Sequence, residues 1–227
     1  MRTGCQWKAL RYPCSYQTIH KWLLRWQREG VFQAILEALV REAESMGLVN
    51  WAYMSMDGSL GKSRRGGEDC GPSPVDRKKG GIKRSLLVEG NGYPIAIITA
   101  PANVPDLNLV EATLKVRIKP SAANAGVRTT LIVDRGYRGQ KVKETIEKEG
   151  LVYRAPPRDR EDPYHRIDIP LTKEERAVRA QVERCHSWFV NYRACLVRYS
   201  YRKESHLAVL TFVAALIWWR RIVSITP

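Results

Sequence analysis

Beyond residue 48 the sequence alternates between short apolar runs and segments of helical periodicity, a pattern that leaves few possible folds. Runs rich in β-branched residues indicate strands, and apolar residues that recur every three or four positions indicate amphipathic helices. The predicted strands cover residues 51–57, 85–89, 93–100, 129–134 and 151–155, and the predicted helices cover 106–116, 140–149 and 173–199. Gly90-Asn91-Gly92, between two of the strands, indicates a hairpin. Because such strands must bury their faces against helices, we predict an α/β fold with a mixed β-sheet flanked by helices.

The first 48 residues have a different character. Apolar positions recur at helical spacing over 16–46, with Gly30 and Gly47 as interruptions. Basic residues lie among these positions and would give the helices a cationic exterior suited to a DNA backbone, the alternative being an ordinary solvated face. We predict a small helical DNA-binding unit over residues 1–48, incomplete at its start, and one larger domain over residues 49–227 that ends in helices.

The charge balance predicts a polyanionic partner. Lys and Arg total 38 against 23 Asp and Glu, a formal net charge of +15, so nucleic acid is the leading candidate. A membrane surface is the alternative, but no apolar stretch reaches the roughly 18 residues that span a bilayer. Residues 207–219 are instead predicted to form a buried helix. Five cysteines without a CxxC pair favour neither a disulfide framework nor a zinc knuckle and fit a reducing cytoplasm.

A stretch rich in Gly, Lys and Arg follows the first predicted strand. We interpret residues 58–84 as a mobile loop whose glycines let the backbone approach phosphate groups closely, with a disordered connection as the alternative. The basic residues of this loop that we expect to contact DNA are Lys62, Arg64, Arg65, Lys78, Lys79, Lys83 and Arg84.

Three acidic residues stand where such a fold would present them to one pocket. Asp57 and Asp134 each end an apolar run and precede a turn, at the sheet edge where ligands commonly bind in α/β folds. Glu183 lies on the predicted helix over 173–199, next to the core position Val182 and one turn from Arg179. Converging carboxylates are the oxygen ligands that a pair of Mg²⁺ ions needs, so the set predicts phosphodiester chemistry.

Each of these residues also has an ordinary interpretation. The aspartates could be turn formers or helix caps, and Glu183 could be half of a helical pair with Arg179. Glu174 and Glu175 are alternatives to Glu183, although both suit the start of a helix. The remaining acidic residues that we interpret as turn or surface residues are Asp76, Glu89 and Asp106.

Several short motifs carry a resemblance to a known family. In chain order they are residues 54–58 (Met-Ser-Met-Asp-Gly), 83–94, 102–106 (Ala-Asn-Val-Pro-Asp), 132–137 (Ile-Val-Asp-Arg-Gly-Tyr) and 182–193. Each motif is weak alone, but their order and spacing are specific, and the resemblance extends over nearly the whole chain. The chain resembles bacterial insertion-sequence transposases of the DDE type, whose catalytic domain is RNase H-like.

The resemblance implies roles for individual residues. Asp57, Asp134 and Glu183 correspond to the family's three catalytic and metal-binding carboxylates, and Arg179 corresponds to the Arg ahead of its Glu. The implied enzyme is a DNA transposase that uses two Mg²⁺ ions, with Mn²⁺ as a substitute. It would cleave strands at insertion-sequence ends and transfer the freed 3′-OH to target DNA.

The resemblance also has departures and implied partners. Arg176 replaces a Tyr of the family pattern and Val190 replaces a Lys, which leaves Arg184 or Arg193, besides Arg179, to contact phosphate. The implied partner is double-stranded DNA, at element ends and target, bound by a homodimer at the nucleoid in a bacterial cytoplasm. Two alternatives stay open: an inactive remnant that only binds DNA, and an RNase H-like nuclease that cuts without joining.

Overall fold

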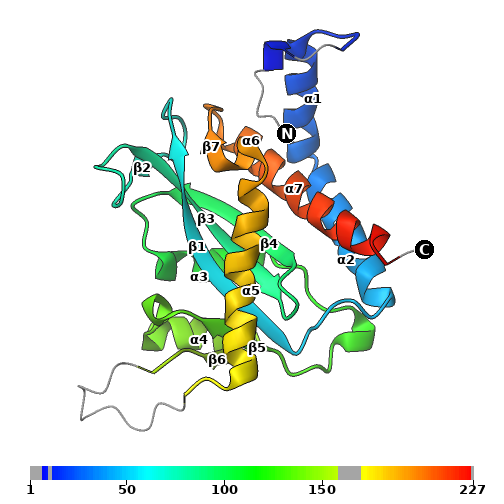
Figure 1. Cartoon of the computed structure of the whole chain (residues 1–227), viewed down its shortest axis with the longest axis vertical. Helices are drawn as coiled ribbons and strands as arrows, with labels where there is room; N and C mark the ends of the chain where they lie inside the picture. Colours follow the sequence, from blue (N-terminus) through cyan, green and yellow to red (C-terminus); the bar gives the residue numbers. More distant parts are fainter. Residues whose placement is uncertain (1–6, 10–11, 158–169, 226–227) are drawn as a thin grey trace.

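The computed structural model describes residues 7–9, 12–157 and 170–225. Figure 1 shows its centre, a twisted sheet with helices packed against it. The principal strands are β1 (Tyr53–Ser63), β3 (Gly80–Glu89), β4 (Pro94–Pro101), β5 (Thr130–Val133) and β6 (Val152–Arg154), and two short strands are β2 (Gly71–Pro72) and β7 (Val197–Arg198). The alternating pattern of the sequence therefore predicted the class of fold correctly.

The sheet mixes antiparallel and parallel pairs. Its main strands lie in the order β4, β3, β1, β5, β6. β3 is antiparallel to both β1 and β4, while β1, β5 and β6 are parallel to one another. The predicted hairpin at Gly90-Asn91-Gly92 is the β3–β4 connection, and Gly92 adopts a φ of +90° there. Nine of the ten residues of β3 are buried, because this strand has a strand on each side and helices over its faces.

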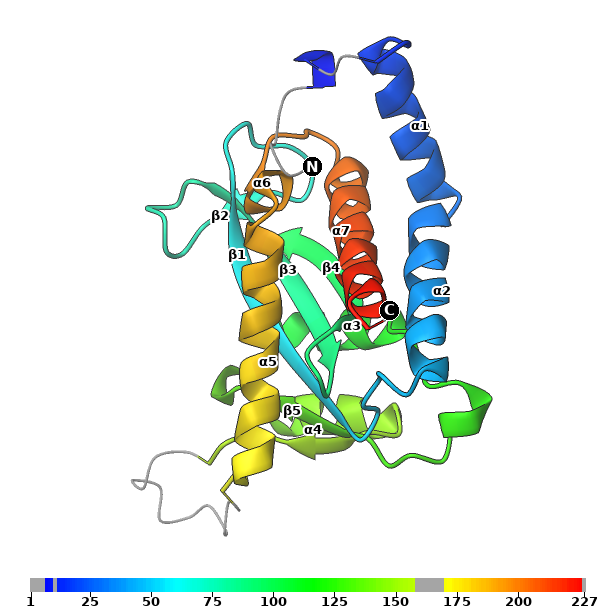
Figure 2. The ribbon, with the colours of Figure 1, turned by 45° about the vertical axis from the view of Figure 1, so that its right-hand side comes forward.

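Helices cover both faces of the sheet. One face carries α5 (Lys173–Val190), which contacts β1, β3 and β5, and α7 (Lys203–Val223), which contacts β4. The opposite face carries α3 (Val110–Lys115) and α4 (Gln140–Lys148). Figure 2 shows α7 between α5 and α2. The short helices are η1 (Trp7–Ala9), η2 (Asp106–Leu109), η3 (Ala122–Asn124), η4 (Arg135–Tyr137) and α6 (Arg193–Leu196).

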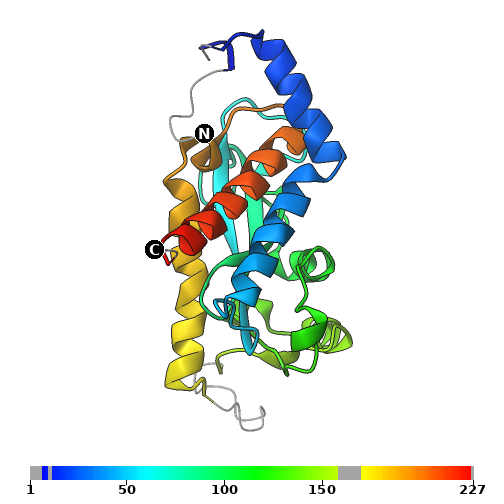
Figure 3. The same ribbon diagram turned by 90° about the vertical axis from the view of Figure 1, so that its right-hand side faces the viewer.

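The N-terminal helices pack against α7. Figure 3 shows α1 (Tyr16–Arg28) and α2 (Val31–Ser45) following one another along one side of the molecule, with α7 crossing beside them. Leu36, Val40 and Ala43 of α2 belong to the same core as Trp218 of α7. Residues 1–48 thus share a core with the rest of the protein where they are described, and the separate DNA-binding role stays a prediction.

α7 is the buried C-terminal helix that the sequence predicts. By length and apolarity it is the one helix within the described ranges that could cross a bilayer, yet 61% of its most apolar stretch is buried inside the protein. Trp218 of α7 is fully buried and its indole N–H donates to the Pro94 carbonyl at 2.7 Å. Its apolar residues are accordingly used in the core, where α2, α5 and β4 cover them.

Two predicted boundaries are wrong. β1 does not end at Asp57 but continues to Ser63, and its register with β3 runs from Met54↔Glu89 to Lys62↔Gly81. Most of the predicted loop over 58–84 is therefore a strand pair, with only residues 64–79 between the two strands. The polar composition misled the prediction because backbone pairing, rather than apolar side chains, holds this part of the sheet.

The predicted helix over 173–199 is also too long. α5 ends at Val190, after which the chain forms α6 and then β7, which pairs with Lys62 and Ser63 at the far end of β1. The apolar spacing that suggested a continuing helix belongs to these separate elements. The helices predicted over 106–116 and 140–149 are confirmed, the first as η2 followed by α3.

Candidate active site

The pairing of β1 with β5 brings two of the three predicted carboxylates together. The parallel register matches Met56 with Val133, so Asp57 and Asp134 are the next residues along neighbouring strands, which lie about 4.8 Å apart in a sheet. Asp57 continues within β1, whereas Asp134 leaves the sheet. The Asp134 side chain accepts a hydrogen bond from the Arg135 backbone N–H at 2.6 Å and caps η4. Asp134 is therefore a helix cap, as the alternative interpretation of the sequence proposed, and it is also a residue of the candidate site.

The surroundings of Asp57 disfavour its negative charge. The pKa of its carboxyl is raised to about 6, chiefly by burial and also by the charges of Asp134 and Asp106. The Gly58 backbone N–H, which donates to Asp57 Oδ1 at 2.8 Å, and the Arg179 guanidinium oppose that shift. A cation close to Asp57 and Asp134 would relieve both the burial cost and the repulsion between the two carboxylates.

Glu183 joins this pair through Arg179. On α5, the Arg179 guanidinium forms an ion pair with Asp134 Oδ2 at 3.1 Å and with Glu183 Oε1 at 2.9 Å. The Glu183 side chain is 58% exposed and that of Asp134 is 44% exposed, so both remain open to solvent. The helical Arg–Glu pair that the sequence allowed is present, and it extends across to the sheet.

The three carboxylates are not gathered closely enough to enclose a metal ion as they stand. Among the described residues no group of three or more His, Cys, Asp or Glu side chains has that arrangement. Arg179 supplies the positive charge between Asp134 and Glu183 instead. Asp57 and Asp134 are thus neighbours across the sheet, and Glu183 is linked to Asp134 through the Arg179 guanidinium. That the three carboxylates act together stays a prediction.

A buried hydroxyl points to a polar occupant beside the two aspartates. Tyr137 is 2% exposed, and its hydroxyl has no hydrogen-bond partner in the described part of the chain. Burial raises the pKa of Tyr137, and the charges of Asp106, Asp57 and Asp134 raise it further. A buried hydroxyl normally has a partner, and a carboxylate-rich neighbourhood suits a hard divalent cation with its water. The residues present therefore fit such a group, provided that Arg179 moves away from Glu183.

Asp106 begins the 3-10 helix η2 and its side chain is 36% exposed, as predicted for a turn or surface residue, but it also belongs to the same neighbourhood. Its Oδ2 forms an ion pair with Lys83 Nζ at 3.0 Å, and its Oδ1 is buried. A Cβ at Gly58, the residue after Asp57, would collide with Asp106 Oδ1. In the sequence, Asp106 was marked only by its place at the end of the family motif at residues 102–106. The apolar periodicity gave no reason to place it near Asp57.

Lys83 and Arg84 are not on an exposed loop, and this corrects the prediction that they contact DNA there. Both are 7% exposed on β3. Arg84 lies 4.9 Å above the Phe189 ring and within 3.3 Å of His186 Nδ1, and burial lowers its pKa. They were misassigned because the strand character of residues 80–84 was not recognised.

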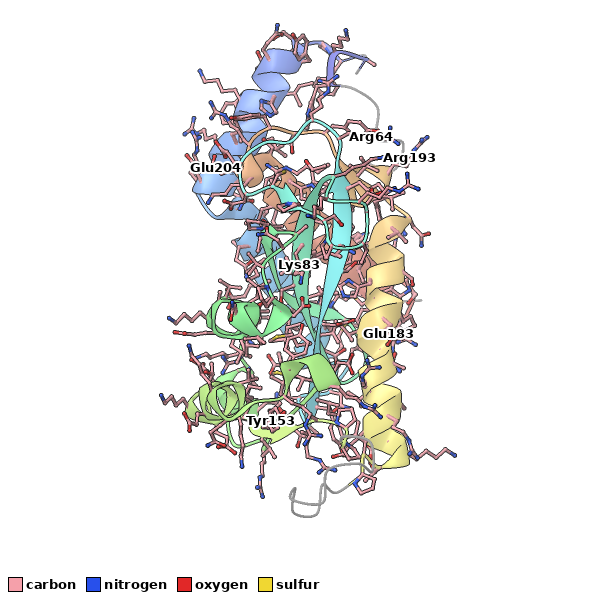
Figure 4. All side chains as sticks on the ribbon, turned by 90° about the vertical axis from the view of Figure 1, so that its left-hand side faces the viewer. Arg64, Lys83, Tyr153, Glu183, Arg193 and Glu204 are labelled. Carbon is pink, nitrogen blue, oxygen red and sulfur yellow. The ribbon has the colours of Figure 1, made fainter. Side chains whose placement is uncertain are left out.

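The other basic residues predicted to contact DNA do lie at the surface or partly exposed. Lys62 is paired with Asp76 at 3.3 Å, and Arg184 donates to the Asn91 carbonyl at 2.8 Å. Figure 4 shows Arg64 and Arg193 at the end of the molecule where β7 joins β1, with Lys83 and Glu183 nearer its middle. The exposed members of the set are Lys62, Arg64, Arg65, Lys78, Lys79, Arg184 and Arg193.

Glu174 and Glu175, the alternatives to Glu183, lie at the start of α5, and Glu89 lies at the end of β3. Glu175 forms a capping box with Thr172 at the start of α5 and an ion pair with Arg154 at 2.8 Å. Glu174 lies in the same first turn. Glu89 is fully buried rather than at the surface, and it accepts the backbone N–H groups of Asn50 and Tyr93 at the β3–β4 turn. Glu175 and Glu89 thus have evident structural roles.

Comparisons with known proteins show that the chain is similar to transposases. The family model described as a transposase DDE domain matches residues 55–219. A putative transposase for insertion sequence element IS402 from Burkholderia cepacia is 29% identical over 173 residues, which cover 70% of this chain and 74% of that protein.

A solved structure is similar in fold. It is the cryo-EM structure of the piggyBac transposase in a synaptic complex with hairpin DNA, with a TM-score of 0.50 and 14% identity. The similarity covers 77% of this chain and 48% of that one, so this chain spans about half the length of that transposase. The likeness supports the RNase H-like fold that the motifs implied.

Proposed function

The chain belongs to the family of transposases with a DDE domain, and on that premise we propose that it acts at the ends of a bacterial insertion sequence. It cleaves DNA strands there and transfers the freed 3′-OH to target DNA. The observation that carries this proposal is the parallel register of β1 and β5, because it sets Asp57 beside Asp134 at the sheet position that α5 faces with Arg179 and Glu183.

The proposed catalytic residues are Asp57, Asp134 and Glu183, which would also hold two divalent cations, Mg²⁺ or Mn²⁺. When bound, such ions lower the pKa of a water molecule and stabilise negative charge on phosphate oxygens. Asp57 is held for this role by the Gly58 N–H, and Asp134 is held by the Arg135 N–H. Their mutual repulsion favours a cation between them.

In this proposal Arg179 has one set of partners without a cation and another when a cation is bound. In the structure it neutralises Asp134 and Glu183, and its guanidinium carries the charge that a cation would otherwise supply. If Asp134 and Glu183 held a cation, the Arg179 guanidinium would be free to bind a DNA phosphate, which its planar shape suits. Arg179 therefore links occupation of the site to DNA binding.

DNA is the proposed partner at the surface. The net charge of +15 provides a long-range attraction for it, and the seven exposed basic residues named above provide phosphate contacts. We propose that the protein works as a homodimer that pairs two element ends, at the nucleoid of the bacterial cytoplasm. The helical region over residues 1–48 is proposed to add contacts to the DNA backbone.

The test uses the DNA that flanks the gene. Purified protein is incubated with a duplex carrying an element end, Mg²⁺ and a target plasmid, and the products are resolved on a gel. Cleaved and joined DNA is the expected result. Cleavage without joining would identify the protein as a nuclease. DNA binding without cleavage would identify it as an inactive transposase remnant. The remnant is the second candidate function because Arg176 and Val190 depart from the family pattern.

The variants locate the chemistry. Asp57→Asn and Asp134→Asn each remove a carboxylate charge with almost no change in shape, and both should abolish cleavage while DNA binding is retained. Glu111→Gln is the matched control, because Glu111 is an exposed carboxylate on α3 that pairs only with Lys115 among the ion pairs described. Normal cleavage by Asp134→Asn would overturn the proposed site.

A further inference from the structure

Outside the three proposed catalytic residues, the structure holds a fourth carboxylate at the same place. Asp106 begins η2, and η2 contacts η4, the short helix that follows Asp134. Asp106 Oδ1 lies so close to Gly58 that a Cβ there would collide with it. Asp106 is therefore next to the backbone that carries Asp57, and η2 lies against the turn that carries Asp134.

The environment of Asp106 sets it apart from a solvated surface aspartate. Its Oδ2 is paired with Lys83, whose side chain is only 9% exposed, while its Oδ1 is buried and has no hydrogen-bond partner among the described residues. A buried carboxylate oxygen without a donor is costly. Burying an ammonium group and a carboxylate oxygen also carries a desolvation cost, which their mutual attraction offsets only in part.

A second observation points from this cluster to a ligand. Tyr137 is 2% exposed, and its hydroxyl has no partner in the described ranges. The charge of Asp106 is the largest electrostatic influence on that hydroxyl, followed by those of Asp57 and Asp134, and all three raise the pKa of Tyr137. The Tyr137 hydroxyl therefore lies within the electrostatic reach of three aspartates, a setting that suits a hydrated cation.

We propose that Asp106 is a fourth acidic residue of the site, and that Asp106 and Lys83 together set how tightly Asp57 and Asp134 bind a divalent cation. This inference rests on the proposed function. Asp106 acts as a positioning residue through its charge: it adds negative potential beside Asp57, and Lys83 offsets part of that potential. Because the two charges have opposite signs, removing each one must shift cation affinity in opposite directions.

The experiment measures Mn²⁺ binding by isothermal titration calorimetry on the full chain without DNA. Asp106→Asn is expected to weaken Mn²⁺ binding about tenfold, which corresponds to about 1.4 kcal/mol. Lys83→Met keeps the apolar stem of the lysine and removes its charge, and it is expected to tighten Mn²⁺ binding several-fold. Asp106→Ser removes the same carboxylate without crowding Gly58 and should reproduce the loss.

The matched control is a second Lys–Asp pair of the same length. Lys203 and Asp69 lie 3.1 Å apart, compared with 3.0 Å for Lys83 and Asp106. Asp69→Asn and Lys203→Met change the net charge by the same amounts and should leave Mn²⁺ affinity unchanged. Thermal melting of every variant confirms that each is folded at the temperature of the titration.

The outcomes separate this inference from the proposed function. Unchanged Mn²⁺ affinity in Asp106→Asn overturns the role of Asp106. A loss of affinity in both Asp106→Asn and Lys83→Met also overturns it, because removing either member of a merely structural ion pair would weaken Mn²⁺ binding. A wild-type protein that binds no Mn²⁺ overturns the metal site itself, and with it the proposed chemistry.

Discussion

Asp57 and Asp134 stand one residue beyond a paired position of two adjacent parallel strands, although 77 residues separate them in the chain. The two residues are neighbours because of the β1–β5 register, and no local sequence feature brings them together. A shift of that register by one residue would turn one of the two side chains to the opposite face of the sheet.

Arg179→Gln should separate metal binding from DNA processing. The change removes the guanidinium that occupies Asp134 and Glu183, so Mn²⁺ affinity is expected to rise roughly three- to tenfold because competition for these carboxylates disappears. Cleavage of an element end should nevertheless fall, since a proposed phosphate contact is lost. Calorimetry and a cleavage assay measure the two effects. Weaker Mn²⁺ binding in the variant would show that Arg179 supports the site rather than competing with a cation.

Gly58→Ala should destabilise the protein and disturb the site. The added Cβ would overlap Asp106 Oδ1, and overpacking of this kind costs about 1–3 kcal/mol. Gly126→Ala is the control, because a Cβ there meets no atom within 4 Å and the backbone is not left-handed. Urea unfolding measures both variants, and we expect Gly126→Ala to stay within about 0.5 kcal/mol of wild type. Equal stability of the two variants would contradict the close approach of η2 to β1.

The protein should lose stability in mild acid because of two histidines. Burial, together with the positive charges nearby, lowers the pKa of His206 to about 3, and burial and Arg84 lower that of His186 to about 3. For His206 those positive charges are Arg198 and Arg84. Both rings stay neutral in the folded state, while the unfolded chain takes up protons near pH 6.5. Stability is therefore full above pH 6.5 and falls as the pH drops below it.

The expected loss between pH 7 and pH 5 is about 2 kcal/mol for each histidine. His206→Gln cannot be protonated, so its stability should fall over this range by about 2 kcal/mol less than that of the wild type. Urea unfolding at pH 7, 6 and 5 provides the comparison. A parallel decline of the two proteins would mean that His206 is protonated in the folded state.

DNA binding should depend steeply on salt. With roughly six phosphate contacts, affinity falls about a thousandfold between 50 and 200 mM salt, because each contact releases counterions. Substituting Gln for both Lys78 and Lys79 should reduce the slope of log affinity against log salt by about two. The same double change at Lys143 and Lys148 of α4 serves as the control. A flat salt response of the wild type would remove DNA as the partner.

Local signals in the sequence predicted the elements well. Helical spacing located α1, α2, α4 and α5, although it overran the end of α5, and Gly90-Asn91-Gly92 located the β3–β4 turn, because these features depend on residues a few positions apart. The same signals failed where composition and pairing disagree. Residues 58–63 and 80–84 are mostly glycine, polar or charged, yet they are strands because each supplies the backbone partners of the other.

The sequence by itself determined the class of fold, the strongly positive charge and the placement of two carboxylates in or directly after a strand, since each of these can be read from composition or short-range periodicity. Only the tertiary structure decided which side chains meet. Asp106 faces Lys83, 23 residues away, and Arg84 faces His186, 102 residues away, through the stacking of η2 and α5 on the sheet. Such pairings depend on the register of strands and the packing of helices across the whole chain, and no local pattern encodes them.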